Sequence, residues 1–141
     1  MPLEPFDVIC HDVALAELRA CHVPEPSASG PGDKYFLREF YCTERRCDCR
    51  RVLVQFIRDG QPSGVAASIN YGWERAGFYA RWSRDTVMAR EMASATLEPF
   101  AEQGPHAQRF LRIFNHLIED PQLVEAFRRH YRLVKEIVDK R

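Results

Sequence analysis

Residues 35–57 read YFLREFYCTERRCDCRRVLVQFI, two apolar runs on either side of a polar segment that holds three cysteines. The first run, Tyr35–Tyr41, is rich in aromatic residues. The second, Val52–Ile57, alternates between a fully apolar face and a mixed face. Both patterns are typical of β-strands. Because the connection between them is short, we expect the two strands to be antiparallel neighbours.

Two further strands are predicted downstream of this pair. Val65–Tyr71 follows a turn rich in glycine and proline, and Phe78–Trp82 follows a second turn over Gly72–Gly77. Short connections between consecutive strands favour pairing in sequence order. We therefore predict a four-stranded antiparallel meander, with the cysteine segment connecting its first and second strands.

The last third of the chain has helical periodicity. Apolar residues recur at helical spacing after Gly104-Pro105, and Asp120-Pro121 interrupts them with a cap residue followed by proline at the first helical position. We expect two helices joined by a very short link, which form a helical hairpin over residues 105–141. Its apolar faces would cover one face of the sheet.

The N-terminal segment predicts a short helix from Asp12 to Ala20, followed by a loop over Pro24–Gly32. All these elements together predict one α+β domain. It comprises an N-terminal helix and loop (1–34), the sheet with the cysteine segment (35–82), a connection (83–104) and the helical hairpin (105–141).

Composition narrows the class of protein. The chain has 141 residues with 20 basic and 20 acidic side chains, and this zero formal charge gives no overall attraction for nucleic acid or an anionic membrane. No segment approaches the roughly 20 apolar residues that span a bilayer. The start, MPLEP, lacks the basic and apolar regions of a signal peptide. We therefore expect a cytoplasmic protein whose thiols stay reduced.

Three of the five cysteines lie within eight residues, in the spacing C-x4-C-x-C. In a reducing compartment such crowding indicates metal or redox chemistry rather than disulfides. Cys47 and Cys49 are two residues apart, so in an extended chain their sulfurs point the same way, and the short loop returns Cys42 toward them. Thiolates favour zinc over magnesium or calcium. The pattern predicts a zinc knuckle holding one ion, with inert thiols and redox-active thiols as the alternatives.

A closed structural zinc site needs a fourth ligand. We predict His22, because it precedes the loop that leads into the first strand. The alternatives that stay open are Cys21, Cys10, His11 and His130.

Four arginines flank the cysteines: Arg45, Arg46, Arg50 and Arg51. Cations favour the thiolate form and can donate hydrogen bonds to sulfur. The same cluster supports an alternative function, a nucleic-acid-binding module, with a second basic set on the last predicted helix and aromatic side chains for stacking. That set comprises Arg128, Arg129, Arg132 and Lys135, and the aromatic residues are Tyr41, Tyr71, Trp73 and Tyr79. We rank nucleic acid second because the overall charge is zero and the aromatics follow a strand pattern.

The chain resembles an uncharacterised bacterial family of small proteins. The motif YC-x4-CDCRRV over residues 41–52 is the specific part, and INYGW, FYARW, LEP and RHY further along extend the similarity to roughly residues 20–135. The resemblance implies a metal site after an extended segment and a C-terminal helical hairpin. It implies no reaction, because the family has no established activity.

A zinc-binding protein with a structural ion and a surface for a protein partner is therefore the predicted function, as a monomer or a small homo-oligomer. Trp73 is a candidate exposed anchor for the partner, although a tryptophan near a turn is more often packed on the core. A metal-dependent hydrolase is a further alternative, with Glu44 or Asp48 as the general base. The sequence lacks the zinc deaminase signature, G-x-S-x-G and the phosphate-binding loop.

Overall fold

The computed structural model describes residues 2–24, 32–61 and 64–141. Most of the predicted Pro24–Gly32 loop, residues 25–31, lies outside this part, as do residues 62–63 of the turn before the third predicted strand. The described residues form an α+β structure, and none of their helices combines the length and apolar character needed to cross a membrane.

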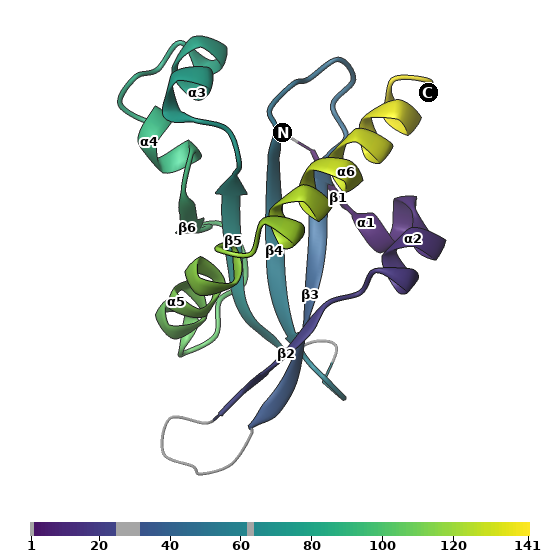
Figure 1. Cartoon of the computed structure of the whole chain (residues 1–141), viewed down its shortest axis with the longest axis vertical. Helices are drawn as coiled ribbons and strands as arrows, with labels where there is room; N and C mark the ends of the chain where they lie inside the picture. Colours follow the sequence, from purple (N-terminus) through teal and green to yellow (C-terminus); the bar gives the residue numbers. More distant parts are fainter. Residues whose placement is uncertain (1, 25–31, 62–63) are drawn as a thin grey trace.

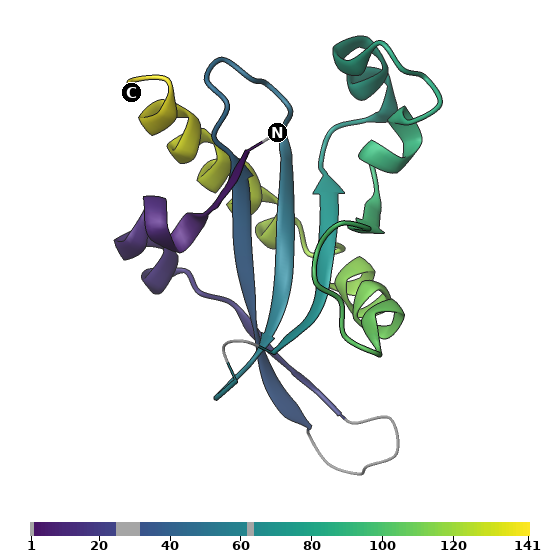
Figure 2. The same ribbon diagram turned by 180° about the vertical axis from the view of Figure 1, so that it is seen from behind.

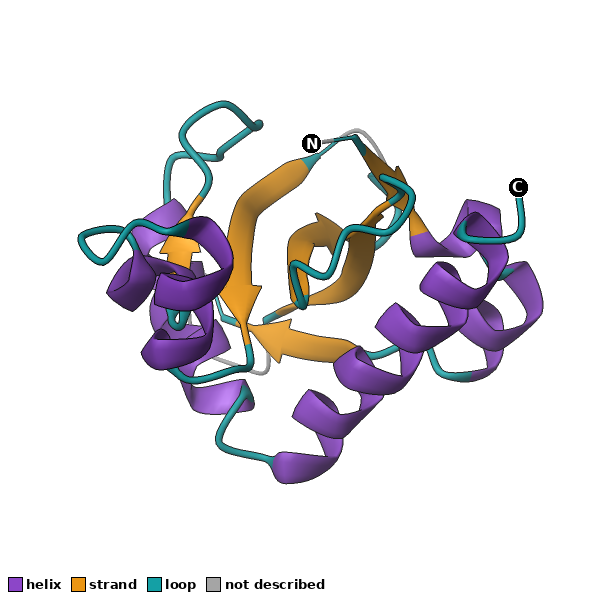
Figure 3. Cartoon of the chain, turned by 90° about the horizontal axis from the view of Figure 1, so that it is seen from above, coloured by secondary structure: helices purple, strands orange, loops and turns teal. Residues whose placement is uncertain are grey.

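The sheet has six antiparallel strands. They are β1 (Leu3–Pro5), β2 (Ala20–Val23), β3 (Asp33–Cys42), β4 (Arg51–Arg58), β5 (Val65–Gly72) and β6 (Ala95–Leu97). The long strands β3, β4 and β5 pair in sequence order. Seen from above, these strands curve strongly (Figure 3).

One edge of β3 is shared by two short strands that the sequence analysis missed. At one end β1 places Leu3 opposite Cys42, and at the other end β2 places Val23 opposite Asp33. The helices α1 (Phe6–Ile9) and α2 (His11–Ala16) connect β1 to β2 beside the sheet (Figure 1). The opposite ends of β3 are therefore a strand's length apart, which matters for the choice of metal ligands below.

Four more helices follow: α3 (Ala76–Ser83), α4 (Ala89–Met92), α5 (Ala107–Leu117) and α6 (Pro121–Val138). Helix α6 starts at the predicted cap, where the Asp120 carboxylate accepts from the Gln122 N–H at 2.9 Å. It crosses β3 and β4, whereas α5 packs against β5 and β6 (Figure 1). Both predicted C-terminal helices exist, but their packing as a hairpin is not confirmed.

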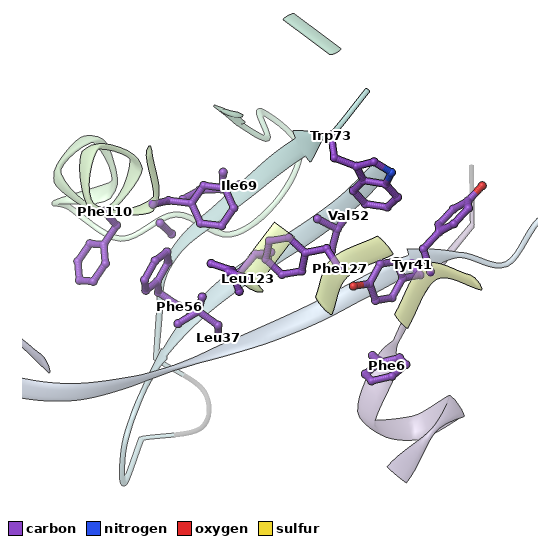
Figure 4. Packing of buried hydrophobic residues seen from close by; sticks show 14 of the residues in the cluster. Phe6, Leu37, Tyr41, Val52, Phe56, Ile69, Trp73, Phe110, Leu123 and Phe127 are labelled. Atoms are coloured by element: carbon purple, nitrogen blue, oxygen red, sulfur yellow. The ribbon is translucent and has the colours of Figure 1, made fainter. Parts of the chain in front are cut away.

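The core lies between the helices and one face of the sheet. Val52, Val54 and Phe56 alternate on this face of β4 and are almost fully buried. Aromatic side chains of α5 and α6, including Phe110 and Phe127, pack over them (Figure 4). Viewed from behind, no described helix crosses β3 to β5 on the other face (Figure 2).

The predicted strand Phe78–Trp82 is wrong, because these residues belong to helix α3. Their aromatic content suggested a strand, yet Tyr79 is the residue of this helix that is buried. Tyr79 is fully buried and its hydroxyl donates to the Arg50 carbonyl at 2.7 Å. The left-handed residue Arg84, with φ 60°, ends the helix. The sheet position expected for this segment is taken by β6, which pairs with β5.

The predicted N-terminal helix is also corrected. Helix α2 ends at Ala16, four residues before the expected end, and Ala20 instead starts β2. The predicted cap, Asp12, lies inside the first turn, whereas Cys10 occupies the cap position without a side-chain hydrogen bond. Pairing with β3 satisfies the backbone from this point, since Leu37 N–H donates to the Arg19 carbonyl at 3.0 Å.

A buried polar group interrupts the apolar core at Glu39 on β3. Glu39 lies opposite Val54 and so faces the helices. One oxygen of its carboxylate, Oε1, accepts from the Tyr41 hydroxyl at 2.5 Å and contacts His130 Nδ1 at 2.7 Å. The His130 ring is 1% exposed and stacks on Phe6 with ring centroids 4.2 Å apart. This contact joins α6, α1 and β3 at one point.

The second nitrogen of His130, Nε2, lies 3.2 Å from Glu17 Oε1. The Arg129 guanidinium hydrogen-bonds to Glu17 and holds the pKa of that carboxyl below its usual value. The His130 ring therefore bridges the Glu39 and Glu17 carboxyl groups, one at each ring nitrogen.

We expect His130→Ala to destabilise the protein by about 3 kcal/mol, because it removes a buried ring that stacks on Phe6 and leaves Glu39 without its hydrogen-bonding partner on α6. Urea unfolding monitored by circular dichroism measures the change. His116→Ala is the matched control, since the His116 side chain is 82% exposed and should matter by less than about 0.5 kcal/mol. Equal stabilities for the two variants would contradict the assigned role of His130.

Candidate metal centre

The three clustered cysteines lie on and beside the loop that joins β3 to β4. Strand β3 ends at Cys42 and β4 starts at Arg51. Arg46 and Arg50, with φ of 64° and 49°, have left-handed backbone conformations that are uncommon for residues other than glycine. They bracket the segment from Cys47 to Cys49, so the chain changes direction immediately before and after these two cysteines.

The structure brings the three predicted cysteine ligands together. The sulfur atoms of Cys42, Cys47 and Cys49 all lie within 4.8 Å of one another. Tetrahedral zinc with Zn–S bonds of about 2.3 Å requires sulfurs about 3.8 Å apart, so the cluster needs to contract by at most about 1 Å. Cys42 and Cys49 are buried, whereas Cys47 is half-buried.

The surroundings of the thiols oppose their ionisation in the metal-free protein. Burial, followed by the nearby Cys42 and Cys47 sulfurs, raises the pKa of Cys49 to about 12. Burial also raises the pKa of Cys47, and the Lys135 ammonium lowers it in part. The Glu44 N–H lies 3.4 Å from Cys42 Sγ, as a backbone donor directed at sulfur. A bound divalent cation would reverse this balance and favour the thiolates.

Helix α6 holds the cysteine loop by contacts spaced four residues apart. The Tyr131 hydroxyl donates a long hydrogen bond of 3.4 Å to the Cys47 carbonyl. Lys135 Nζ donates to the Glu44 carbonyl at 2.9 Å, and Asp139 accepts from the Arg46 N–H at 3.0 Å. Residues at this spacing share one helix face. We call Tyr131, Lys135 and Asp139 the loop clamp.

The structure does not bring His22 to the sulfurs, so this predicted fourth ligand must be corrected. His22 lies on β2 opposite Lys34, whereas Cys42 is the last residue of β3, eight positions further along the same strand. At about 3.3 Å per residue, the two ends of that segment are roughly 26 Å apart. The sequence analysis missed the pairing of β2 with β3, which fixes His22 at the far end.

The other candidates for the fourth ligand are also placed elsewhere. Both ring nitrogens of His130 contact carboxylates, Cys21 lies opposite Tyr35 on β2, and Cys10 and His11 lie where α1 meets α2. Among the described residues, no histidine, aspartate, glutamate or further cysteine joins the group of three sulfurs. The described part of the chain therefore offers three ligands to an ion.

Several arginines around the cysteines and on α6 lie close to acidic side chains. Arg50 makes two hydrogen bonds of 2.9 Å to Asp48 and lies 3.6 Å from Glu74. On α6, Arg128 and Arg132 lie near Glu125, and Arg129 pairs with Glu17. Three of the aromatic residues expected to stack on bases are buried: Tyr41, Trp73 and Tyr79. These pairings favour neutral local patches over a nucleic-acid surface.

The candidate catalytic bases, Glu44 and Asp48, lie outside the sulfur group, and the candidate anchor, Trp73, is packed against the core. Asp48 is paired with Arg50, and the Glu44 side chain is exposed outside the sulfur group. The Trp73 ring is only 9% exposed and packs edge-on against Tyr131 at 5.3 Å, so it is not an exposed anchor. The packed interpretation of Trp73 is the one that the structure confirms.

Sequence reasoning missed the loop clamp and the distinct position of Arg51. The sequence analysis places Lys135 in a basic set on the last helix. Its spacing of four residues from both Tyr131 and Asp139 is the signal that these three side chains share one face of the helix. Arg50 precedes β4 and has a left-handed backbone, whereas Arg51 is the first residue of the strand. This change of backbone conformation separates the two neighbouring side chains.

Comparison with known proteins adds no relative from which a function can be transferred. No family model matches the chain, and neither the curated proteins nor the solved structures contain a significant match. The similarity to small bacterial proteins with the YC-x4-CDCRRV motif stays a prediction. The three converging thiols are thus the feature of this chain from which a function has to be inferred.

Proposed function

We propose that this chain is a zinc-binding protein in which Cys42, Cys47 and Cys49 hold one ion with a structural role. The observation that carries the proposal is the convergence of their sulfurs within 4.8 Å, at the junction of β3 and β4. Three soft sulfur donors fit zinc better than any hard cation. A cytoplasmic location, in which thiols stay reduced, is part of the proposal.

The structural role follows from where the loop is attached. An ion would tie the end of β3 to the residues that lead into β4, and the loop clamp would extend this connection to α6. An ion that binds the folded protein but not the unfolded chain increases the free energy of unfolding. The ion would therefore stabilise the end of the sheet that also holds β1, where Thr43 N–H donates to the Pro2 carbonyl at 3.0 Å.

A surface for a protein partner completes the proposed function, because a structural ion performs no task by itself. Supporting it are exposed apolar side chains in and just after α1 and α2, namely Val8, Leu15 and Leu18. Chemical crosslinking in a cell lysate tests for a partner, and comparison with Leu15→Glu assigns it to this region. Size-exclusion chromatography with light scattering distinguishes a monomer from a small homo-oligomer.

We expect untagged protein, purified reduced and without chelator, to contain about one zinc per chain by elemental analysis. Cys47→Ser removes a sulfur donor and should abolish stoichiometric zinc. Cys21→Ser is the matched control, because Cys21 is also half-buried but lies on β2, outside the sulfur group. Absence of zinc from the wild type, or equal zinc in both variants, would refute the proposal.

Zinc affinity should rise steeply with pH. The raised pKa values of Cys47 and Cys49 keep both thiols protonated near neutral pH, so binding an ion must release at least these two protons. The apparent affinity should then increase about 100-fold per pH unit, and fall by the same factor on acidification. Competition with a chromophoric chelator between about pH 6 and 7.5 measures this slope. A slope near zero would show that the two thiols are not ligands.

A further inference from the structure

A cavity lies directly beside the sulfur cluster. Its volume is about 200 Å³, and Cys42 and Cys49 form part of its wall. Arg51, Asn70 and Glu98 supply its polar groups, and the rest of the wall is apolar. A closed apolar cavity of about 150 Å³ can admit a benzene molecule, so this volume accommodates a small ligand. The sulfur group has three members among the described residues, which leaves one position of a tetrahedral ion for such a ligand.

Arg51 is the unusual side chain in this cavity. Its Nε atom is buried and has no hydrogen-bond partner among the described residues. Arg51 lies opposite Gly72 on β5, where the Tyr79 side chain and the Met92 carbonyl pack closely against the glycine. Burial lowers the pKa of Arg51, while Tyr79, Cys49 and Glu98 partly offset this effect. A guanidinium has five N–H donors and stays charged, so an unused buried donor is costly unless a ligand accepts from it.

Charged groups of both signs surround the sulfur cluster. Three thiolates on a divalent ion leave one net negative charge. Two cations interact electrostatically with these sulfurs. Arg51 interacts with Cys49, and Lys135 interacts with Cys47 and Cys49. Glu98 accepts from the Asn70 amide and from the Phe100 N–H, and its negative charge also acts on Arg51. Among the described residues the Arg51 Nε donor still has no partner beside this carboxylate, so a ligand that accepts from it would satisfy the remaining polar group.

We propose that the fourth metal position is completed by a small-molecule thiolate that enters this cavity and accepts a hydrogen bond from Arg51. The inference rests on the proposed zinc site. A sulfur donor is the class that matches the three protein ligands, and the apolar part of the wall would contact the ligand's carbon atoms. No bond is made or broken in the ligand except loss of the thiol proton to solvent as sulfur binds the metal.

Cobalt substitution gives a direct measurement. Protein purified with a phosphine reductant, free of thiols and chelators, is loaded with Co²⁺, whose charge-transfer absorption reports bound thiolates. Titration with 2-mercaptoethanol should increase this absorption with saturation, as a fourth sulfur binds. Propionate, a carboxylate of similar size, should leave it unchanged. Gel filtration after the titration should recover cobalt with the protein.

Two arginine variants assign the ligand to the cavity. Arg51→Gln should weaken 2-mercaptoethanol binding by about tenfold, because a charge-assisted hydrogen bond is lost, and Arg51→Lys should restore part of the affinity. Arg50→Gln is the matched control, since Arg50 is paired with Asp48, and it should bind the thiol like the wild type. Circular dichroism of each variant verifies that it is folded.

The outcomes separate this inference from the proposed function. Absence of any thiolate–cobalt absorption in the wild type would refute the zinc site and the ligand with it. Normal absorption without a response to 2-mercaptoethanol would overturn the ligand inference alone. A saturating response to propionate instead, or equal thiol affinity in Arg51→Gln and wild type, would also overturn it.

Discussion

Helix α6 is the constraint on which the rest of the structure depends. Its buried face packs Phe127 and Val134 over the sheet, and His130 meets Glu39 of β3 in the same layer. Two turns of the same helix then present the loop clamp to the cysteine loop. Because a helix is stiff over this length, the position of the sulfurs follows from the packing of the core. A site built on a loop thus gains the precision of a regular element.

Much of the fold could be predicted because sequence pattern and tertiary packing agree. Strand β4 alternates as a half-buried strand must, and Asp120-Pro121 starts α6 where local chemistry requires it. The failures are segments whose structure is decided by distant residues. Phe78–Trp82 has strand-like composition, but burial of Tyr79 against the Arg50 carbonyl requires a helix. The edge strands β1, β2 and β6 have three or four residues each, too few for a periodic signal.

The same distinction applies to the candidate site. The spacing C-x4-C-x-C predicted the convergence of the sulfurs, because a short loop between antiparallel strands limits how far apart they can be. His22 was wrong for a reason of register, since its separation from Cys42 in space is set by β2 pairing with the start of β3. Arg50 and Arg51 look equivalent as a dipeptide. Arg50, however, precedes β4 with a left-handed backbone and pairs with Asp48, whereas Arg51 starts the strand and interacts with Cys49.

The electrostatics of the loop favour a metal over free thiols. In the metal-free protein Cys49 is protonated at neutral pH, so Lys135 and Arg51 lie near neutral thiols, and Glu98 is an acidic group that acts on Arg51. Three thiolates on a divalent ion change the balance, since both cations then face net negative charge. The electrostatic free energy of the two cations would therefore be more favourable with the ion bound than without it, and this difference would add to the affinity for the ion.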